Sequence, residues 1–260
     1  MAPDEVPGYT FVRPLNEPVP GGDVVMLARR HSDGSEVAVR LYDRHLDSAR
    51  DRQRFEHEVA GLKALDDVPY VLPILDAGID PHGRVHVVMP YCQSGSLHDH
   101  LLAVGRLTAI EVRRIGVKLA TALAGVHQRD IFHRNVSPSN VLIDAAGEPA
   151  LSDFSLVSLS LSDADFRPEP DRDLRIYLAP EAYLPELMTA TADIYALGVT
   201  LYALLAGGAP ARYPIDGDDL MELPRVPWSL MNVLRRAVAL DPADRFPDAM
   251  ELRMALIASA

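Results

Sequence analysis

Lysine is almost absent from this chain of 260 residues, since only Lys63 and Lys118 occur and arginine supplies the other 23 basic side chains. Acidic side chains number 37, which leaves a net charge of −12. This balance argues against nucleic acid or an anionic membrane as a partner, because both attract positive surfaces. A site for a small polyanion would have to concentrate its positive charge locally. The arginine bias indicates a GC-rich, actinobacterial genome.

Cysteine and long apolar runs are also scarce. Cys92 is the only cysteine, so no internal disulfide bond forms and nothing indicates an oxidising compartment. The longest apolar run, Ile194–Ala206, contains Gly198 and Thr200 and is too short to span a bilayer. Residues 1–19 are rich in proline and acid, unlike a signal peptide. We therefore expect a cytoplasmic protein that does not insert into membranes.

The first part of the chain, up to about residue 90, has the pattern of a small sheet with one helix. Short segments rich in β-branched residues predict strands at 23–30, 36–42, 70–76 and 84–91. Between them, Ser48–Leu65 is predicted to be a helix, because Phe55, Val59 and Leu62 fall on one apolar face.

The rest of the chain is predicted to be mainly helical. Thr108 and Glu111 have the spacing of a capping box that begins a long helix. Residues 192–206 are apolar nearly all round, which indicates a helix buried on every side. Glycines at 207–208 would end it, and two further helices are predicted at 228–239 and 246–257.

Three motifs follow one another in this second part. Ile131–Asp144 reads IFHRNVSPSNVLID, Leu151–Ser155 reads LSDFS, and Ala179–Glu181 reads APE. They resemble the H-R-D-x-x-x-x-N, D-F-G and A-P-E motifs of eukaryotic-type (Hanks-type) Ser/Thr protein kinases. The chain departs from the pattern at Asn135, where the family has the catalytic Asp, and at Ser155, where it has the glycine of D-F-G.

Further matches extend the resemblance over nearly the whole chain. Arg40 ends a Val-Ala-Val-Arg run that resembles the strand motif V-A-I-K, and Glu58 lies on the helix that carries the family's ion-pair Glu. Asp193 begins a run that resembles the family's central buried helix. Arg245 lies in a closing motif whose Arg pairs with the Glu of A-P-E, here Glu181.

The resemblance implies a fold class and a domain plan. We expect an α+β, bilobal protein-kinase-like domain over residues 1–260. A small β-rich lobe with one helix would occupy 1–91, and a larger, mainly helical lobe would occupy 92–260.

The groups that would carry the chemistry are degenerate. Asn135 cannot act as a general base, a role worth about 10²–10⁴ in rate. Ser137 replaces the lysine that steadies the transferred phosphoryl group, and Arg40 replaces the strand lysine that holds the phosphates. Drift at a tolerant basic position is one explanation of Arg40. We favour a structural role, because a planar guanidinium suits a bidentate pair with Glu58.

The loop that should cover the phosphates is also altered. The positions of G-x-G-x-x-G are Pro18, Pro20 and Asp23. Prolines remove amide donors, and the Asp23 carboxylate would repel a phosphate. The pair Gly21–Gly22 could offer amides in a shifted register, but a simple hairpin turn is the preferred interpretation.

Two potential metal ligands remain, Asn140 and Asp153. A carboxylate and an amide oxygen beside substrate phosphates suit Mg²⁺. In an alternative of equal weight, Asp153 pairs with Arg40 and Asn140 bonds the backbone of its own loop.

The remaining matches concern apolar and structural residues. The resemblance implies an adenine pocket lined by Val25, Ala38, Met89, Pro90, Cys92 and Leu142. It also implies a packed column of side chains that links the two lobes, with Asp193 at its base. The members of this column are His133, Phe154, Leu62 and Ile74. Core packing alone would explain the same residues.

The segment between Asp153 and Glu181 is the least kinase-like. Leu174 stands where kinases that dock a peptide have Thr. The acidic residues of this segment could engage Arg134 and imitate a phosphate permanently. They are Asp163, Asp165, Glu169, Asp171 and Asp173. Serines at 155, 158, 160 and 162 could be phosphorylated, although loop serines are usually only solvated.

These residues predict a bacterial pseudokinase, a protein-binding scaffold or allosteric regulator in signalling. Its partner would be another protein, such as an active kinase or its substrate, and not a nucleic acid. No cofactor would be required, and ATP and Mg²⁺ would bind weakly if at all. The alternatives are a weak or unconventional Ser/Thr protein kinase and an ATP-sensing switch that binds nucleotide without transferring phosphate.

Overall fold

The structure is a computed structural model that describes residues 6–17, 22–80, 83–154, 176–183, 189–223 and 225–260. These residues divide into two compact units. Unit 1 comprises residues 6–67 and 72–93, and unit 2 comprises residues 68–71, 94–154 and those from 176 onward, apart from the gaps just given.

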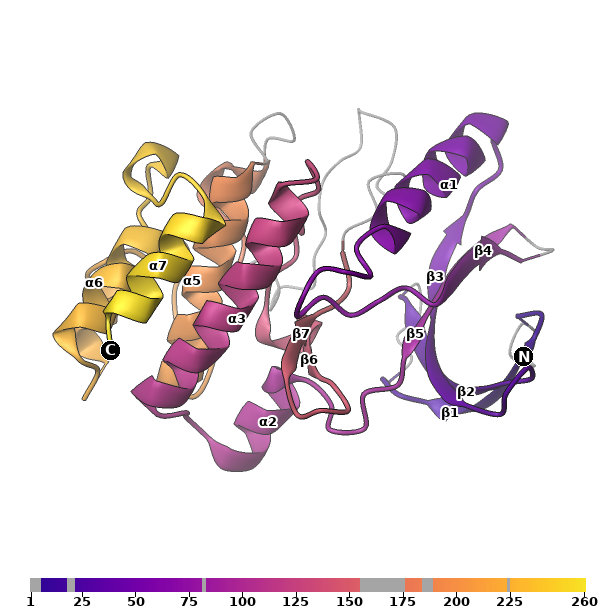
Figure 1. The fold of residues 1–260 in the computed structure, drawn as a ribbon, viewed down its shortest axis with the longest axis horizontal. Coiled ribbons are helices and arrows are strands. Elements are labelled where there is room, and N and C mark those ends of the chain that lie inside the picture. Colours follow the sequence, from indigo (N-terminus) through magenta and orange to yellow (C-terminus); the bar gives the residue numbers. More distant parts are fainter. Residues whose placement is uncertain (1–5, 18–21, 81–82, 155–175, 184–188, 224) are drawn as a thin grey trace. The chain divides into compact units, whose positions relative to one another are not determined.

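Unit 1 is built on an antiparallel five-stranded sheet with the strand order β1-β2-β3-β5-β4. Figure 1 shows these strands in indigo to purple. Their bounds are β1 (Tyr9–Pro14), β2 (Val24–Arg30), β3 (Glu36–His45), β4 (Asp76–Ile79) and β5 (Arg84–Pro90).

The register of the sheet sorts its side chains onto two faces. Val39 of β3 pairs with Met26 of β2 and with Val88 of β5, and these side chains belong to one hydrophobic cluster. Because side chains alternate along a strand, the neighbouring pairs must point to the opposite face. Arg40, opposite Val25, therefore lies on the face that the cluster does not use.

The helix of unit 1 is α1 (Ala49–Lys63). Ser48 caps it by accepting a hydrogen bond from the backbone N–H of Asp51 at 3.0 Å, which satisfies one of the unpaired amides of the first turn. Phe55, Val59 and Leu62 are its buried side chains, as the sequence predicts.

The prediction of a strand at residues 70–76 is wrong. Residue 71 makes only an isolated bridge to Leu151, and β4 begins at Asp76. Pro73 has no N–H to donate to a ladder, which disfavours pairing in this segment. The first ladder-like bond beyond it is the one from Leu75 N to Val88 O, at 2.8 Å.

Unit 2 is mainly helical (Figure 1). Helix α3 packs against α5 and α7, and α5 also packs against α6. The bounds are α2 (Leu97–Val104), α3 (Ala109–His127), α5 (Ala190–Ala206), α6 (Trp228–Ala237) and α7 (Ala249–Ala258). A two-stranded hairpin, β6 (Val141–Ile143) and β7 (Pro149–Leu151), and short 3-10 turns complete the unit.

The two predictions for the long helices of unit 2 are confirmed. Thr108 and Glu111 form the capping box at the start of α3. Helix α5 is buried at nearly every position from Ala192 to Leu205. It ends at Gly207, whose φ of 88° lies in the left-handed region that glycine adopts without strain.

Among the described residues, no helix combines the length and the apolar character needed to cross a bilayer.

Candidate functional site

The candidate site in unit 2 is the loop that contains His133, Arg134 and Asn135. Its backbone is bound by Asp193, the buried acid in the first turn of α5. Asp193 accepts the backbone N–H groups of His133 and Arg134, both at 2.8 Å, and its Oδ2 lies 2.9 Å from Nε2 of His127. Burial raises the pKa of Asp193, but the hydrogen bond and charge of His127 outweigh it, so the net pKa is lowered. An ionised carboxylate therefore fixes the backbone of the loop.

His133 links this loop to the segment before Phe154. Burial lowers its pKa, which favours the neutral imidazole. Nε2 lies 2.9 Å from the carbonyl oxygen of Ser152, and Nδ1 accepts the backbone N–H of Asn135 at 3.3 Å. This pattern places the proton on Nε2. The ring also packs against Phe154 with centroids 4.4 Å apart, so the predicted contacts of this column within unit 2 are present.

Asn135 lies at the centre of the loop and bonds to both potential metal ligands. Its Nδ2 donates to Oδ2 of Asp153 at 3.3 Å, and its carbonyl oxygen accepts Nδ2 of Asn140 at 2.7 Å. Asn140 is buried, and its own carbonyl oxygen accepts two hydrogen bonds from Ser152, each of 2.9 Å. The predicted bond from Asn140 to its loop backbone is therefore present.

Asp153 and Asn140 offer a carboxylate and an amide oxygen, the donors that suit a magnesium ion beside substrate phosphates. In this structure Oδ2 of Asp153 accepts a hydrogen bond from the side-chain amide of Asn135. Within the described residues there is no group of three or more His, Cys, Asp or Glu that could hold a metal ion. We derive no step through a metal.

Ser137 supplies no charge at the position of the family's lysine. Its residue is 1% exposed, and its Oγ has no hydrogen-bond partner in the part of the chain that the structure describes. Pro138 follows at the start of a short 3-10 turn (Pro138–Asn140). The side chain can contribute packing but cannot steady a phosphoryl group.

Arg40, the cation on strand β3 of unit 1, is bound by Asp23 from the connection between β1 and β2. Arg40 donates to Oδ2 of Asp23 from Nε at 3.1 Å and from Nη2 at 2.6 Å, and its guanidinium lies over the ring of Tyr42. Sequence reasoning identified both residues but did not pair them, because it assigned Arg40 to Glu58. The pair of Arg40 with Glu58 stays a prediction.

Asn16 is a residue of this loop that sequence reasoning missed. Its Nδ2 donates to the carbonyl oxygen of Asp23 at 3.1 Å, and its Oδ1 accepts the N–H of Val25 at 2.7 Å. The side chain thus ties the two ends of the β1–β2 connection together. Asparagine is typical of such turns, which is the signal that could have revealed it. Pro18, Pro20 and Gly21 lie outside the described residues.

Three residues of the predicted adenine pocket share a face of the sheet. Ala38 of β3 pairs with Met89 of β5, and both lie two positions from the pair of Arg40 with Val87, so they point to the same side as Arg40. Val25, opposite Arg40, joins them. Pro90 ends β5 and Cys92 follows in unit 1, whereas Leu142 lies on β6 of unit 2.

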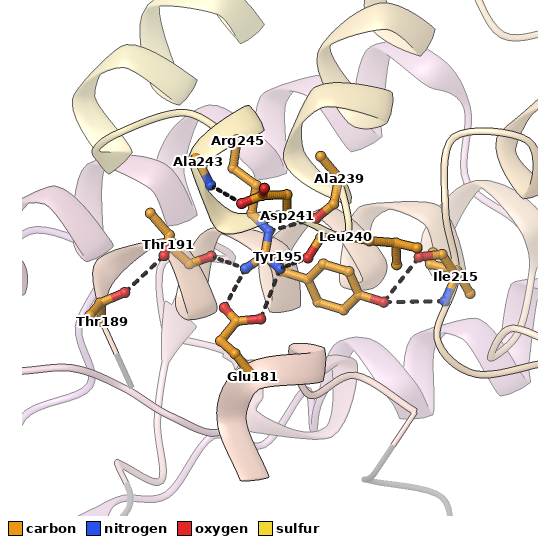
Figure 2. A network of polar contacts seen from close by, with 10 residues as sticks. All are labelled: Glu181, Thr189, Thr191, Tyr195, Ile215, Ala239, Leu240, Asp241, Ala243 and Arg245. Atoms are coloured by element: carbon orange, nitrogen blue, oxygen red, sulfur yellow. Dashed lines mark hydrogen bonds and ion pairs between the residues drawn. The ribbon is translucent and has the colours of Figure 1, made fainter. Parts of the chain in front are cut away.

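Glu181 and Arg245 form the buried ion pair that the sequence predicts (Figure 2). Nη1 lies 2.5 Å from Oε1, and Nη2 lies 2.9 Å from Oε2. The remaining donors of Arg245 bond the carbonyl oxygens of Thr191, Ala239 and Leu240, so each of the five N–H groups of the guanidinium has a partner. The Arg245 side chain is 0% exposed, which makes this pair an anchor of unit 2.

Most of the segment between Asp153 and Glu181 cannot be compared with its predictions. The serines at 155, 158, 160 and 162, the five acidic residues and Leu174 all lie outside the described residues. The predicted engagement of Arg134 by those acids stays a prediction.

Comparison with known proteins bears on the identity of this site. Residues 21–239 match the family profile described as "Protein kinase domain". The chain is 30% identical over 236 residues to the serine/threonine-protein kinase PrkC of Bacillus subtilis, which covers 84% of this chain and 35% of PrkC. It is 31% identical over 223 residues to the serine/threonine-protein kinase PknK of Mycobacterium tuberculosis, which covers 80% of this chain and 20% of PknK. The chain thus spans about a third or less of the length of these curated relatives.

Solved structures give the same result. The crystal structure of the PknI kinase domain from Mycobacterium tuberculosis matches 97% of this chain, and 96% of that chain is covered, with a TM-score of 0.77 and 27% sequence identity. Rad53 in complex with AMP-PNP matches 95% of this chain with a TM-score of 0.72, and 64% of that chain is covered. At 21% identity the latter likeness concerns the fold alone. The fold is that of a protein kinase, with an antiparallel sheet in unit 1 and helices in unit 2.

Proposed function

Because this chain belongs to the protein kinase family, we propose that it is a pseudokinase, a kinase-fold module that binds another protein and transfers no phosphate. The observation that carries the proposal is the contact of Asn135 with Asp153. The residue at the position of the base is a neutral amide, and it donates a hydrogen bond to the carboxylate that would hold the metal. A side chain in this role takes no proton from a substrate hydroxyl.

A second observation supports the proposal from unit 1. Kinase catalysis depends mainly on positioning and on neutralising the charge of the triphosphate. Arg40 instead neutralises Asp23 of its own chain. Ser137 adds no cation in unit 2, so two positions that are cationic in the family contribute little to phosphate binding.

The structural part of the kinase plan is intact, which favours a scaffold or allosteric regulator. Asp193 holds the loop of His133, and Arg245 holds Glu181. We propose one kinase-like domain over residues 1–260 that acts in the cytoplasm, with an active kinase or its substrate as the partner. ATP and Mg²⁺ are not required for this role.

Two further functions remain as alternatives because Asn140 and Asp153 are retained. The first is a weak or unconventional Ser/Thr protein kinase, and the second is an ATP-sensing switch. Both require nucleotide binding, whereas the scaffold does not.

Thermal unfolding with and without ATP and Mg²⁺ separates these functions. A ligand at 100 times its dissociation constant stabilises the folded state by about 2.7 kcal/mol, which shifts the unfolding temperature measurably. The scaffold predicts no shift at 1 mM ATP, a concentration that would saturate a site of about 10 μM affinity. A clear shift would instead support the switch or the weak kinase.

A further inference from the structure

We propose that Asp23 occupies an anion-binding site on β3 and competes there with the phosphates of a nucleotide. The inference rests on the proposed function, because it explains why the strand cation does not serve a triphosphate. Removing this one carboxylate should open a site for a polyphosphate in unit 1.

The carboxylate of Asp23 is bound in the manner of a phosphate. Its Oδ2 accepts Nε and Nη2 of Arg40, and its Oδ1 accepts the backbone N–H of Asp43 at 3.1 Å. A guanidinium and a backbone amide that converge on neighbouring oxygens are the donors with which proteins bind phosphate groups. The ring of Tyr42, 4.9 Å from the Arg40 guanidinium, supports the cation.

The loop presents Asp23 to this site in a fixed position. Asn16 bonds both the carbonyl oxygen of Asp23 and the N–H of Val25, so the backbone that follows the Asp23 side chain is held. A group tethered in this way has a high effective concentration at its site and needs little further ordering to bind. A soluble phosphate would have to exceed that effective concentration.

The site is open to solvent, so a soluble anion can reach it. The side chains of Arg40 and Asp23 are 23% and 30% exposed. While Asp23 is bound, its carboxylate oxygens occupy the hydrogen-bond donors of the site, and its negative charge repels an incoming phosphate. The groups that carry this competition, Asp23, Arg40 and the backbone N–H of Asp43, all belong to unit 1.

Titration calorimetry of three variants tests the inference. D23N removes the charge of Asp23 but keeps its shape, and D23N/R40A also removes the cation. D33N is the matched control, because Asp33 pairs with Arg30 in the turn after β2 of the same unit. The probes are inorganic tripolyphosphate, ATP and adenosine, all without Mg²⁺.

We expect D23N to bind tripolyphosphate and ATP up to about fivefold more tightly than the parent, the largest gain that an exposed competing ion pair is typically worth. D33N should bind like the parent, and D23N/R40A should lose the gain. Adenosine, which has no phosphate, should not distinguish D23N from the parent.

Equal binding of tripolyphosphate by D23N and D33N would overturn the inference, and so would a gain that persists in D23N/R40A. If D23N does not fold, D23G carries the same expectation, because glycine is the residue of the family pattern. Phosphate transfer by the unmodified chain would overturn the proposed function but leave this comparison valid. The two ideas can therefore fail separately.

Discussion

The side-chain amide of Asn135 donates a hydrogen bond to Asp153, with 3.3 Å between Nδ2 and Oδ2. An aspartate at position 135 would face the same carboxylate with a like charge. In this chain an uncharged donor faces Asp153 at that position. The contact stabilises the loop without a ligand.

This relationship predicts the effect of Asn135→Asp. The substitution replaces a hydrogen bond with two adjacent carboxylates, so the free energy of unfolding in EDTA should fall by about 1–3 kcal/mol. Mg²⁺ should recover part of the loss by binding between them. Chemical unfolding with EDTA or with Mg²⁺ measures both effects.

The control for that substitution is Asn232→Asp, which introduces the same charge at an exposed position of α6. Its stability should not respond to Mg²⁺. If Asn135→Asp is as stable in EDTA as Asn232→Asp, the hydrogen bond does not stabilise the loop.

Arg245→Ala should be among the most damaging substitutions in unit 2. It strands the carboxylate of Glu181 in a buried place and leaves three carbonyl oxygens without their donor. Breaking one side of a buried pair costs about 3–5 kcal/mol. Thermal unfolding measures the loss, with Arg30→Ala as the control from an exposed pair. Equal unfolding temperatures for the two variants would show that the anchor is not structural.

Gly198→Ala should also destabilise unit 2. A Cβ at Gly198 would lie 2.8 Å from Cγ1 of Val238 and 3.0 Å from Cβ of Ala237, at the contact of α5 with α6. Overpacking of this kind costs about 1–3 kcal/mol. Gly208→Ala is the matched control, since a Cβ there meets nothing within 4 Å. An equal effect of both substitutions would contradict the close packing of these helices.

Acid should destabilise the protein below about pH 6.5, the ordinary pKa of histidine. Burial lowers the pKa of His133 and of His86 in the folded state. As the pH falls, the unfolded chain takes up protons first, so the stability present above pH ~6.5 is lost below it, by up to about 1.4 kcal/mol per pH unit for each group.

The acid prediction is checked by urea unfolding between pH 5 and 8, a range centred on the ordinary histidine pKa of about 6.5. His86→Gln should make the loss shallower because one buried imidazole no longer titrates. His57→Gln, at an exposed position of α1, is the control. An unchanged slope in His86→Gln would mean that its burial does not affect the titration.

The sequence predicts those elements that local chemistry determines. The capping residues Thr108 and Glu111 predict the start of α3. The nearly unbroken apolar stretch of α5 predicts that this helix is buried. Helix α2 was missed, although Ser96 and Asp99 form a capping box there, because the box uses Asp in place of Glu or Gln. The prediction for residues 70–76 failed because their β-branched content is typical of a strand, whereas pairing with β5 begins only at Asp76.

The motif spacing predicted the positions of the site residues and the pair of Glu181 with Arg245, but not every pairing. The motif spacing located Asn135, Asn140 and Asp153, since each position is defined along the chain. The partner of Arg40 was not predictable in this way. Asp23 lies 17 residues earlier in the sequence and meets Arg40 only because β2 and β3 pair in a particular register.

Transfer of labelled phosphate from ATP tests the central claim most directly. The unmodified chain with ATP and Mg²⁺ should label neither itself nor a generic basic protein, while an active Ser/Thr kinase assayed in parallel labels that protein. Asn135→Asp alone should stay inactive too, because a base contributes only about 10²–10⁴ and charge neutralisation is the larger deficit. Robust labelling by the unmodified chain would contradict the pseudokinase proposal and favour an unconventional kinase.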